Sequence, residues 1–176
     1  MQAANNPVVG APTSDQECWY TVLTNSGHVT ADKTLHYQAV KGNRLREAIN
    51  KAWSHELSGR LISLAGDAAA ILHDARNRLA NVHQGYIDRG QTIPSKIILT
   101  GVACATASEI RATPPNVPRI DVVYTPIMPS DPAHSDIVTY QAATKDDLDL
   151  VRDWLIRTLR VIQGESFESL VDSCGQ

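Results

Sequence analysis

The chain has 176 residues, of which 43% are hydrophobic and 20% are charged. These fractions exclude a disordered, collagen-like or disulfide-scaffold protein, and the length predicts one domain with one core. Sixteen Lys and Arg against nineteen Asp and Glu give a formal net charge of −3. Because a dedicated nucleic-acid binder carries a basic excess, we do not expect nucleic acid as the main partner.

The sequence carries no sign of secretion or membrane insertion. No basic region followed by an apolar run opens the chain, and no stretch approaches 18 consecutive apolar residues. We therefore expect no signal peptide, no membrane contact, and a cytoplasmic or virion location. The three cysteines, Cys18, Cys104 and Cys174, are widely spaced and form no CxxC pair, which favours reduced thiols.

Residues 1–16 are rich in Ala, Asn, Pro and Ser, with hardly a large apolar side chain among them. Such a segment cannot bury enough surface to offset the entropy lost on ordering it. The prediction is a flexible arm over 1–16 and a single folded domain over 17–176. Val8 and Val9 form an apolar pair suited to lying along a neighbouring subunit.

The folded part begins with a predicted hairpin. The run CWYTVL at 18–23 has the aromatic and β-branched content of a strand, and residues 25–27 supply a turn. Residues 35–39 then alternate apolar and polar side chains, as a strand with one buried face does.

Residues 44–86 carry the strongest pattern in the chain, with apolar side chains separated by three or four residues. The spacing predicts helix over this range, either continuous or broken near Gly59 or Gly66. A single helix would span about 60 Å, longer than such a domain is wide, so it either breaks or lies against another subunit. The apolar positions are Leu45, Ile49, Trp53, Leu57, Leu61, Leu64, Ala68, Leu72, Ala75, Leu79 and Val82.

Three further strands are predicted, at 96–105 (KIILTGVACA), 120–125 (IDVVYT) and 136–140 (DIVTY). Pro126, Pro129 and Pro132 between the last two exclude a tight hairpin and predict an ordered excursion or a flexible arm. Ile127 and Met128 are the only large apolar side chains in this segment, which makes them candidate contact residues.

A C-terminal helix is predicted from the spacing of Thr144 and Asp147, which matches a capping box. One apolar stripe follows and ends before Gly164, formed by Leu148, Val151, Leu155, Leu159 and Ile162. Because the strands are clustered rather than alternating with helices, the predicted class is α+β. A mainly antiparallel sheet, made of the N-terminal hairpin plus three strands, would carry the long helical region and the amphipathic C-terminal helix on one face.

Candidate chemistry is sparse. Cys104 lies at the end of a predicted strand, and His134 with Asp131 or Asp136 could supply a base and a group that orients it. No glycine-rich turn flanks Cys104, whose alanine neighbours suit a buried structural thiol. His55 is followed by Glu56 but has no second histidine at zinc-ligand spacing, and the phosphate-binding glycine motifs are absent. We therefore predict no catalytic residue, metal or cofactor.

The arm, the helical stripe and the proline-rich excursion together indicate a non-catalytic structural or assembly subunit. Its expected partners are copies of itself and other proteins, contacted through Val8, Val9, Ile127 and Met128. The order of helix, three strands and helix over about 60–162 is similar to that of the tail terminator and tail completion proteins of long-tailed bacteriophages. That resemblance implies a ring-forming component.

Two alternatives to the assembly hypothesis stay open. One is a small cytoplasmic enzyme with a site around Cys104 and His134. The other is a regulatory adaptor module that binds a protein or a small ligand.

Overall fold

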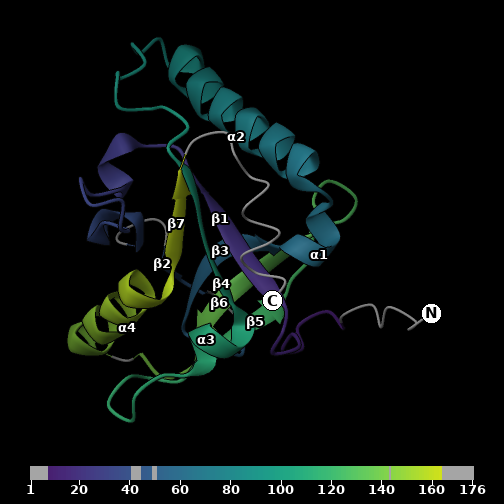
Figure 1. The fold of residues 1–176 in the computed structure, drawn as a ribbon, viewed down its shortest axis with the longest axis vertical. Helices are drawn as coiled ribbons and strands as arrows, with labels where there is room; N and C mark the ends of the chain where they lie inside the picture. The colour runs from purple at the N-terminus through teal and green to yellow at the C-terminus, as the bar shows by residue number, and fades with distance from the viewer. Residues whose placement is uncertain (1–7, 41–44, 49–50, 143, 164–176) are drawn as a thin grey trace.

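The computed structural model describes residues 8–40, 45–48, 51–142 and 144–163. Within them one antiparallel sheet of seven strands has the order β5-β6-β3-β1-β4-β7, with β2 paired to β3 (Figure 1). The α+β class is therefore confirmed. The strands are β1 Cys18–Leu23, β2 Leu45–Glu47, β3 His55–Leu61, β4 Gly101–Thr106, β5 Ile120–Tyr124, β6 His134–Thr139 and β7 Arg160–Gln163.

Two longer helices and several short ones accompany the sheet. They are α1 Ile62–Ala65, α2 Ala68–Asp88, α3 Ala107–Arg111 and α4 Lys145–Thr158, with 3-10 turns at Ser26–His28 and Tyr37–Val40. Among the described helices, none combines the length and the apolar composition that crossing a bilayer requires.

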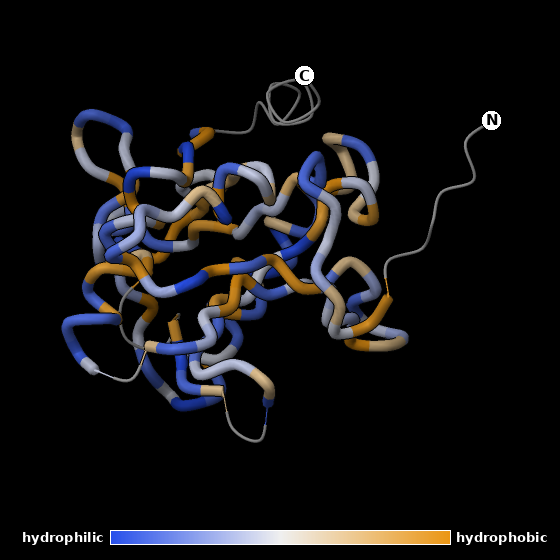
Figure 2. The backbone as a smooth tube through the Cα atoms, turned by 90° about the horizontal axis from the view of Figure 1, so that it is seen from below, coloured by the Kyte–Doolittle hydropathy of each residue, from blue (hydrophilic) through white to orange (hydrophobic). Residues whose placement is uncertain are grey.

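The central strand β1 is buried on both sides and divides the core in two. Trp19 and Leu23 pack with residues of α3 and α4, whereas Tyr20 and Val22 pack with Ile71 of α2. The two longer helices therefore cover opposite faces, not one face as predicted, and Figure 1 shows them on either side of the sheet. We call these the α4 face and the α2 face. Figure 2 shows apolar stretches along the interior strands between them.

The predicted helix over 44–86 is correct only in its second half. Residues 45–47 and 55–61 form β2 and β3, and the helical region begins at Ile62. Leu57 and Leu61 lie four residues apart, a spacing that puts them on one side of a helix and also on one face of a strand. Strand geometry is selected by packing: a Cβ added at Gly59 would lie 2.2 Å from the ring of Trp19. Only glycine lets these two strands approach so closely.

The predicted N-terminal hairpin is wrong. β1 pairs with β3 and β4 instead, and the segment after it forms a single bridge between Val29 and Leu35 before a 3-10 turn. A strand buried on both faces needs long-range partners on both edges, and local alternation does not reveal them.

The three later strands are confirmed, the first of them only from Gly101 onward. Gly101 has a φ of +145°, and an added Cβ would lie 2.1 Å from the carbonyl oxygen of Ile162 in β7. This glycine therefore combines a backbone conformation that other residues rarely adopt with close contact to the edge strand.

The C-terminal helix begins as predicted. The Asp147 N–H donates to the Thr144 hydroxyl at 3.1 Å, and the Thr144 N–H donates to the Asp147 carboxylate at 2.9 Å. The helix ends at Thr158, earlier than predicted, and the chain continues as β7. Leu159 still packs with Val151 and Leu155 of α4, whereas Ile162 lies in β7 and packs in the core cluster of the α2 face.

The cysteines differ from the expectation of three reduced thiols. Cys18 is disulfide-bonded, which corrects the prediction for this residue, and the prediction for Cys174 lies outside the described residues. Cys104 is free and buried.

Candidate functional site

The four predicted contact residues are all exposed. The exposed fractions are 71% for Val8, 68% for Val9, 50% for Ile127 and 71% for Met128. Large apolar side chains at such exposure are the usual mark of a contact surface when they gather in one place.

The proline-rich excursion is an ordered turn, which we call the tip (residues 127–131). The Ile127 N–H donates to the Asp131 carbonyl oxygen at 3.0 Å, and the Asp131 N–H donates back at 2.7 Å. The Ser130 hydroxyl also donates to the Ile127 carbonyl at 3.2 Å. The backbone of the tip is therefore closed on itself while its two apolar side chains face solvent.

An ion-pair network, which we call the clamp, fastens the tip to the body of the protein. Arg60 of β3 binds the Asp131 carboxylate with two nitrogens, Nε at 2.9 Å and Nη2 at 2.7 Å. Asp74 and Arg78 of α2 complete the network, with Asp74 3.3 Å from both arginines. The Arg60 and Asp131 side chains are only 13% and 14% exposed, so solvent screens this pair weakly.

Part of the predicted arm lies against the same end of the sheet. The Gly10 N–H donates to the carbonyl of Tyr124, the last residue of β5, at 2.7 Å, and the Thr13 N–H donates to Val122 at 2.9 Å. Residues 10–13 thus extend the sheet beyond β5. Val8 and Val9 directly precede this segment, and the tip follows Tyr124 after Thr125 and Pro126. The two predicted contact segments therefore adjoin the same end of β5.

Cys104 and His134 do not meet. Cys104 pairs with Tyr20, Tyr20 with Arg60, and Arg60 with His134, so the four residues form one row across four strands. Three strand spacings of about 4.8 Å separate the ends of that row by about 14 Å. Burial raises the pKa of the Cys104 thiol to about 11, against an opposing effect of Arg160. The contact between nucleophile and base that the enzyme alternative requires is absent, and the thiolate is disfavoured.

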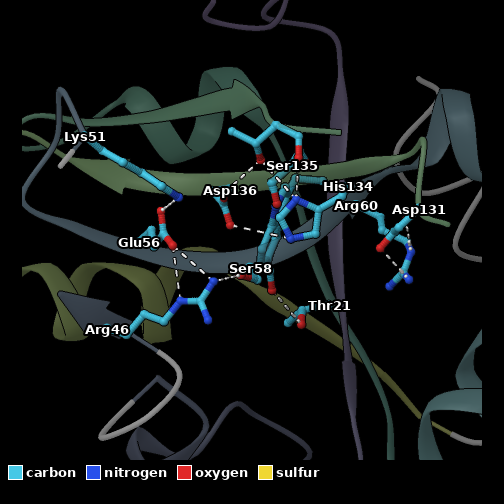
Figure 3. A network of polar contacts seen from close by, with 12 residues as sticks. Thr21, Arg46, Lys51, Glu56, Ser58, Arg60, Asp131, His134, Ser135 and Asp136 are labelled. Atoms are coloured by element: carbon cyan, nitrogen blue, oxygen red, sulfur yellow. Dashed lines mark hydrogen bonds and ion pairs between the residues drawn. The ribbon is translucent and has the colours of Figure 1, made fainter. Parts of the chain in front are cut away.

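His134 faces Asp136, one of the two aspartates considered for it, while Asp131 belongs to the clamp. His134 Nδ1 lies 2.7 Å from the Thr125 carbonyl oxygen. Because a carbonyl only accepts, Nδ1 carries a proton, and in a neutral imidazole Nε2 is then an acceptor. Asp136 Oδ1 lies 3.9 Å from that Nε2 and has no hydrogen-bond partner (Figure 3). We call these two residues the acceptor pair.

The other two buried carboxylates of the described sheet are fully partnered. Glu56 accepts from Lys51 at 2.6 Å, from Trp53 at 2.9 Å and from Arg46 at 3.1 Å. Burial by itself would raise the pKa of Glu56, but these hydrogen bonds and charges hold it below its usual value. Asp121 is bound by Arg111 at 2.6 Å and by Arg119 at 3.4 Å.

Two cavities open beside these groups. One of about 170 Å³ lies behind the tip, and its wall includes the clamp and Tyr20, whose hydroxyl is buried without a hydrogen-bond partner. The other, of about 250 Å³, is lined by Arg46, Ser58 and Arg78 among others. Within the described ranges no three His, Cys, Asp or Glu side chains come together as a metal cluster.

Sequence reasoning missed the clamp and the role of Thr125. The available signal was the alternation of polar residues along β3, and the pairing of β3 with β6 places Ser58, Arg60, His134 and Asp136 on one face. Comparison with models of protein families, with curated proteins and with solved structures found no match to this chain. The proposed function therefore rests on the geometry of these residues.

Proposed function

We propose that the protein is a non-catalytic assembly subunit that binds a second copy of itself through the tip and Val8–Val9. One observation carries the proposal: a weakly exposed, bidentate ion pair fixes a turn whose two large side chains are apolar and exposed. Taking the charges of Arg60 and Asp131 out of water costs free energy. In the isolated chain this ion pair fixes the tip but leaves both Ile127 and Met128 exposed. Burying them against a partner supplies roughly 25 cal/mol per Å² of apolar surface.

A second copy is the partner that this surface suits best. A contact between copies needs no surface beyond those that this one chain supplies. Val8, Val9, Ile127 and Met128 carry no charge, so two copies meet at these side chains without like-charge repulsion.

The finer form of the proposal is a ring-forming component similar to the tail terminator and tail completion proteins of phages. The order α2, β4, β5, β6, α4 supports it, with α3 inserted and β7 added. The enzyme hypothesis loses its main support, because Tyr20 and Arg60 separate Cys104 from His134.

Sedimentation velocity at micromolar concentration tests the proposal on the wild type and on the double variant Ile127→Ser/Met128→Ser. We expect self-association in the wild type and at least a tenfold weaker association constant in the variant, with an unchanged melting temperature of the monomer. A matched control is Ile87→Ser/Ile98→Ser, which removes two side chains that are 56% and 47% exposed. A monomeric wild type, or equal weakening in the control, would contradict the proposal.

A further inference from the structure

The larger of the two cavities, of about 250 Å³, lies where β1 and β3 stop pairing. The last aligned pair of the two strands is Tyr20 and Arg60. One residue further along β1, the Thr21 hydroxyl donates to the carbonyl oxygen of Ser58 in β3 at 3.2 Å (Figure 3), and both residues line the cavity. Side chains of β2 and α2 complete the described wall, so parts of the sheet and of one helix surround one space.

The polar part of this lining is basic. Arg46 of β2 and Arg78 of α2 contribute guanidinium groups, Ser58 and Thr24 contribute hydroxyl groups, and the described lining includes no carboxylate. Arginine stays protonated in proteins and carries several N–H donors in a fixed plane. A space with two such groups and no acid in its described wall suits an anion, and we call it the basic cavity.

Carboxylates that do not line the basic cavity hold both arginines in place. Arg46 binds Glu56 with two nitrogens, Nε and Nη2, both at 3.1 Å. Arg78 lies 3.3 Å from Asp74 through Nε and 3.5 Å from Asp131 through Nη2. Among the described residues, neither arginine has a partner for Nη1. Each guanidinium group is therefore oriented by one side of its fork and keeps a nitrogen for a ligand, as preorganised binding residues do.

The charge beside the basic cavity is positive as well. Arg46 and Lys51 share one carboxylate, that of Glu56, so this group carries one surplus positive charge. Ser58 adds a hydroxyl donor, because its oxygen accepts from Arg46 Nη2 at 3.4 Å and its proton is left for another acceptor. An anion placed here therefore meets positive charge and hydrogen-bond donors together, the combination that makes strong charge-assisted hydrogen bonds.

We propose that the basic cavity binds a small phosphate monoester. Its arginine and hydroxyl donors come from three elements, β2, β3 and α2. A tetrahedral phosphate presents terminal oxygens in three directions, whereas a carboxylate presents its two oxygens in one plane. Donors that converge from three elements therefore suit phosphate better than carboxylate.

The size and the apolar wall of the basic cavity favour an ester over the free ion. At about 30 Å³ for each water-sized group, the cavity admits about eight non-hydrogen atoms. A phosphate group with its oxygens accounts for five of these, which leaves room for a short organic substituent. Val22, Leu57 and Val82 form the apolar part of the lining, where such a substituent displaces water from apolar surface.

This site does not depend on the proposed self-association. Neither the tip side chains Ile127 and Met128 nor Val8 and Val9 line the basic cavity. Arg46→Gln should therefore weaken phosphate binding and keep the sedimentation behaviour of the wild type. Ile127→Ser/Met128→Ser should do the opposite, so failure of one proposal is distinguishable from failure of the other.

Thermal melts and isothermal titration calorimetry of the full chain test the site. The probes are ethyl phosphate, inorganic phosphate and propionate, each at the same ionic strength. A ligand that binds the folded state raises the melting temperature. We expect ethyl phosphate to raise it and to bind with one molecule per chain, inorganic phosphate to bind more weakly, and propionate to have no effect beyond that of sodium chloride.

Arg46→Gln and Arg78→Gln should each weaken ethyl phosphate binding about tenfold, because each removes a charged donor. The matched control is Arg76→Gln, which removes the same charge from an exposed position of α2 outside the lining and should leave the affinity unchanged. Ser58→Ala leaves the ion pairs intact and should weaken binding by a smaller factor, which keeps the site testable if an arginine variant fails to fold.

Three results would overturn the site: no binding of ethyl phosphate to the wild type, undiminished binding in the cavity variants, or equal weakening in Arg76→Gln. Binding of inorganic phosphate or propionate that is as tight as that of ethyl phosphate would overturn the assignment of the ligand as a phosphate monoester.

Discussion

Glu56 and Asp136 lie on the same face of neighbouring strands and are equally buried, yet the protein treats them in opposite ways. Glu56 is surrounded by Lys51, Arg46 and Trp53, while one oxygen of Asp136 has no hydrogen-bond partner and lies 3.9 Å from His134 Nε2. The first arrangement offsets the cost of burying a charge, and the second leaves that cost uncompensated. The number of partners, rather than the degree of burial, therefore distinguishes the two carboxylates, and substitutions at each residue test this distinction.

The largest effect is expected at Glu56. Replacing it with Gln removes the charge that binds Lys51 and Arg46, and we expect a loss of about 2–3 kcal/mol in the free energy of unfolding. Urea unfolding at neutral pH measures this loss. A change below about 0.5 kcal/mol would show that the Glu56 contacts are no more than surface ion pairs.

The same carboxylate should make the protein sensitive to acid. Its folded-state pKa is lowered, so its contribution to stability is complete above the unfolded-state value and disappears as the pH falls through the folded-state value. The stability difference between the wild type and Glu56→Gln should therefore narrow below about pH 4. Urea unfolding across a pH series measures this trend. A stability difference between the wild type and Glu56→Gln that grows in acid would contradict the prediction.

A smaller effect is expected at the clamp. Asp131→Asn keeps the shape of the side chain but removes its charge, and should cost about 1–2 kcal/mol. Because Asp131 also holds the tip, the variant should weaken self-association as well. Urea unfolding and sedimentation of the same sample measure the two effects. Unchanged association alongside reduced stability would show that the clamp serves the monomer alone.

The smallest effect is expected at Cys104, where the measured property is the reactivity of the thiol. Burial raises its pKa to about 11, so at pH 8 only about one thiol in a thousand is ionised. Labelling of the folded protein by iodoacetamide should be far slower than labelling of glutathione. Labelling at the glutathione rate would restore the enzyme hypothesis.

The sequence predicts the α+β class and the capping box at Thr144 and Asp147, and it leaves the excursion around Ile127 and Met128 as either ordered or flexible. These features depend on local composition and spacing, which a single chain displays. The spacing of Leu57 and Leu61 predicts a helix where the structure has β3, because that spacing fits both a helix and a strand. Only the contact with Trp19 at Gly59 selects the strand.

The candidate site was predictable only in part. The sequence offers His134 with Asp131 or Asp136 as partners of Cys104, and of these residues the structure places only His134 and Asp136 next to each other. The roles of Arg60 and Thr125 depend on strand register and on contacts between segments far apart in sequence. Neither composition nor periodicity encodes such contacts.

The central claim about the two carboxylates is that partners offset the cost of burying Glu56 but not the cost of burying Asp136. The most direct measurement is urea unfolding of Asp136→Asn beside Glu56→Gln under identical conditions. Our interpretation predicts opposite outcomes: Glu56→Gln loses about 2–3 kcal/mol, while Asp136→Asn loses nothing or gains up to about 1 kcal/mol. A loss in Asp136→Asn as large as that in Glu56→Gln would show that both carboxylates are structural, and would contradict this interpretation.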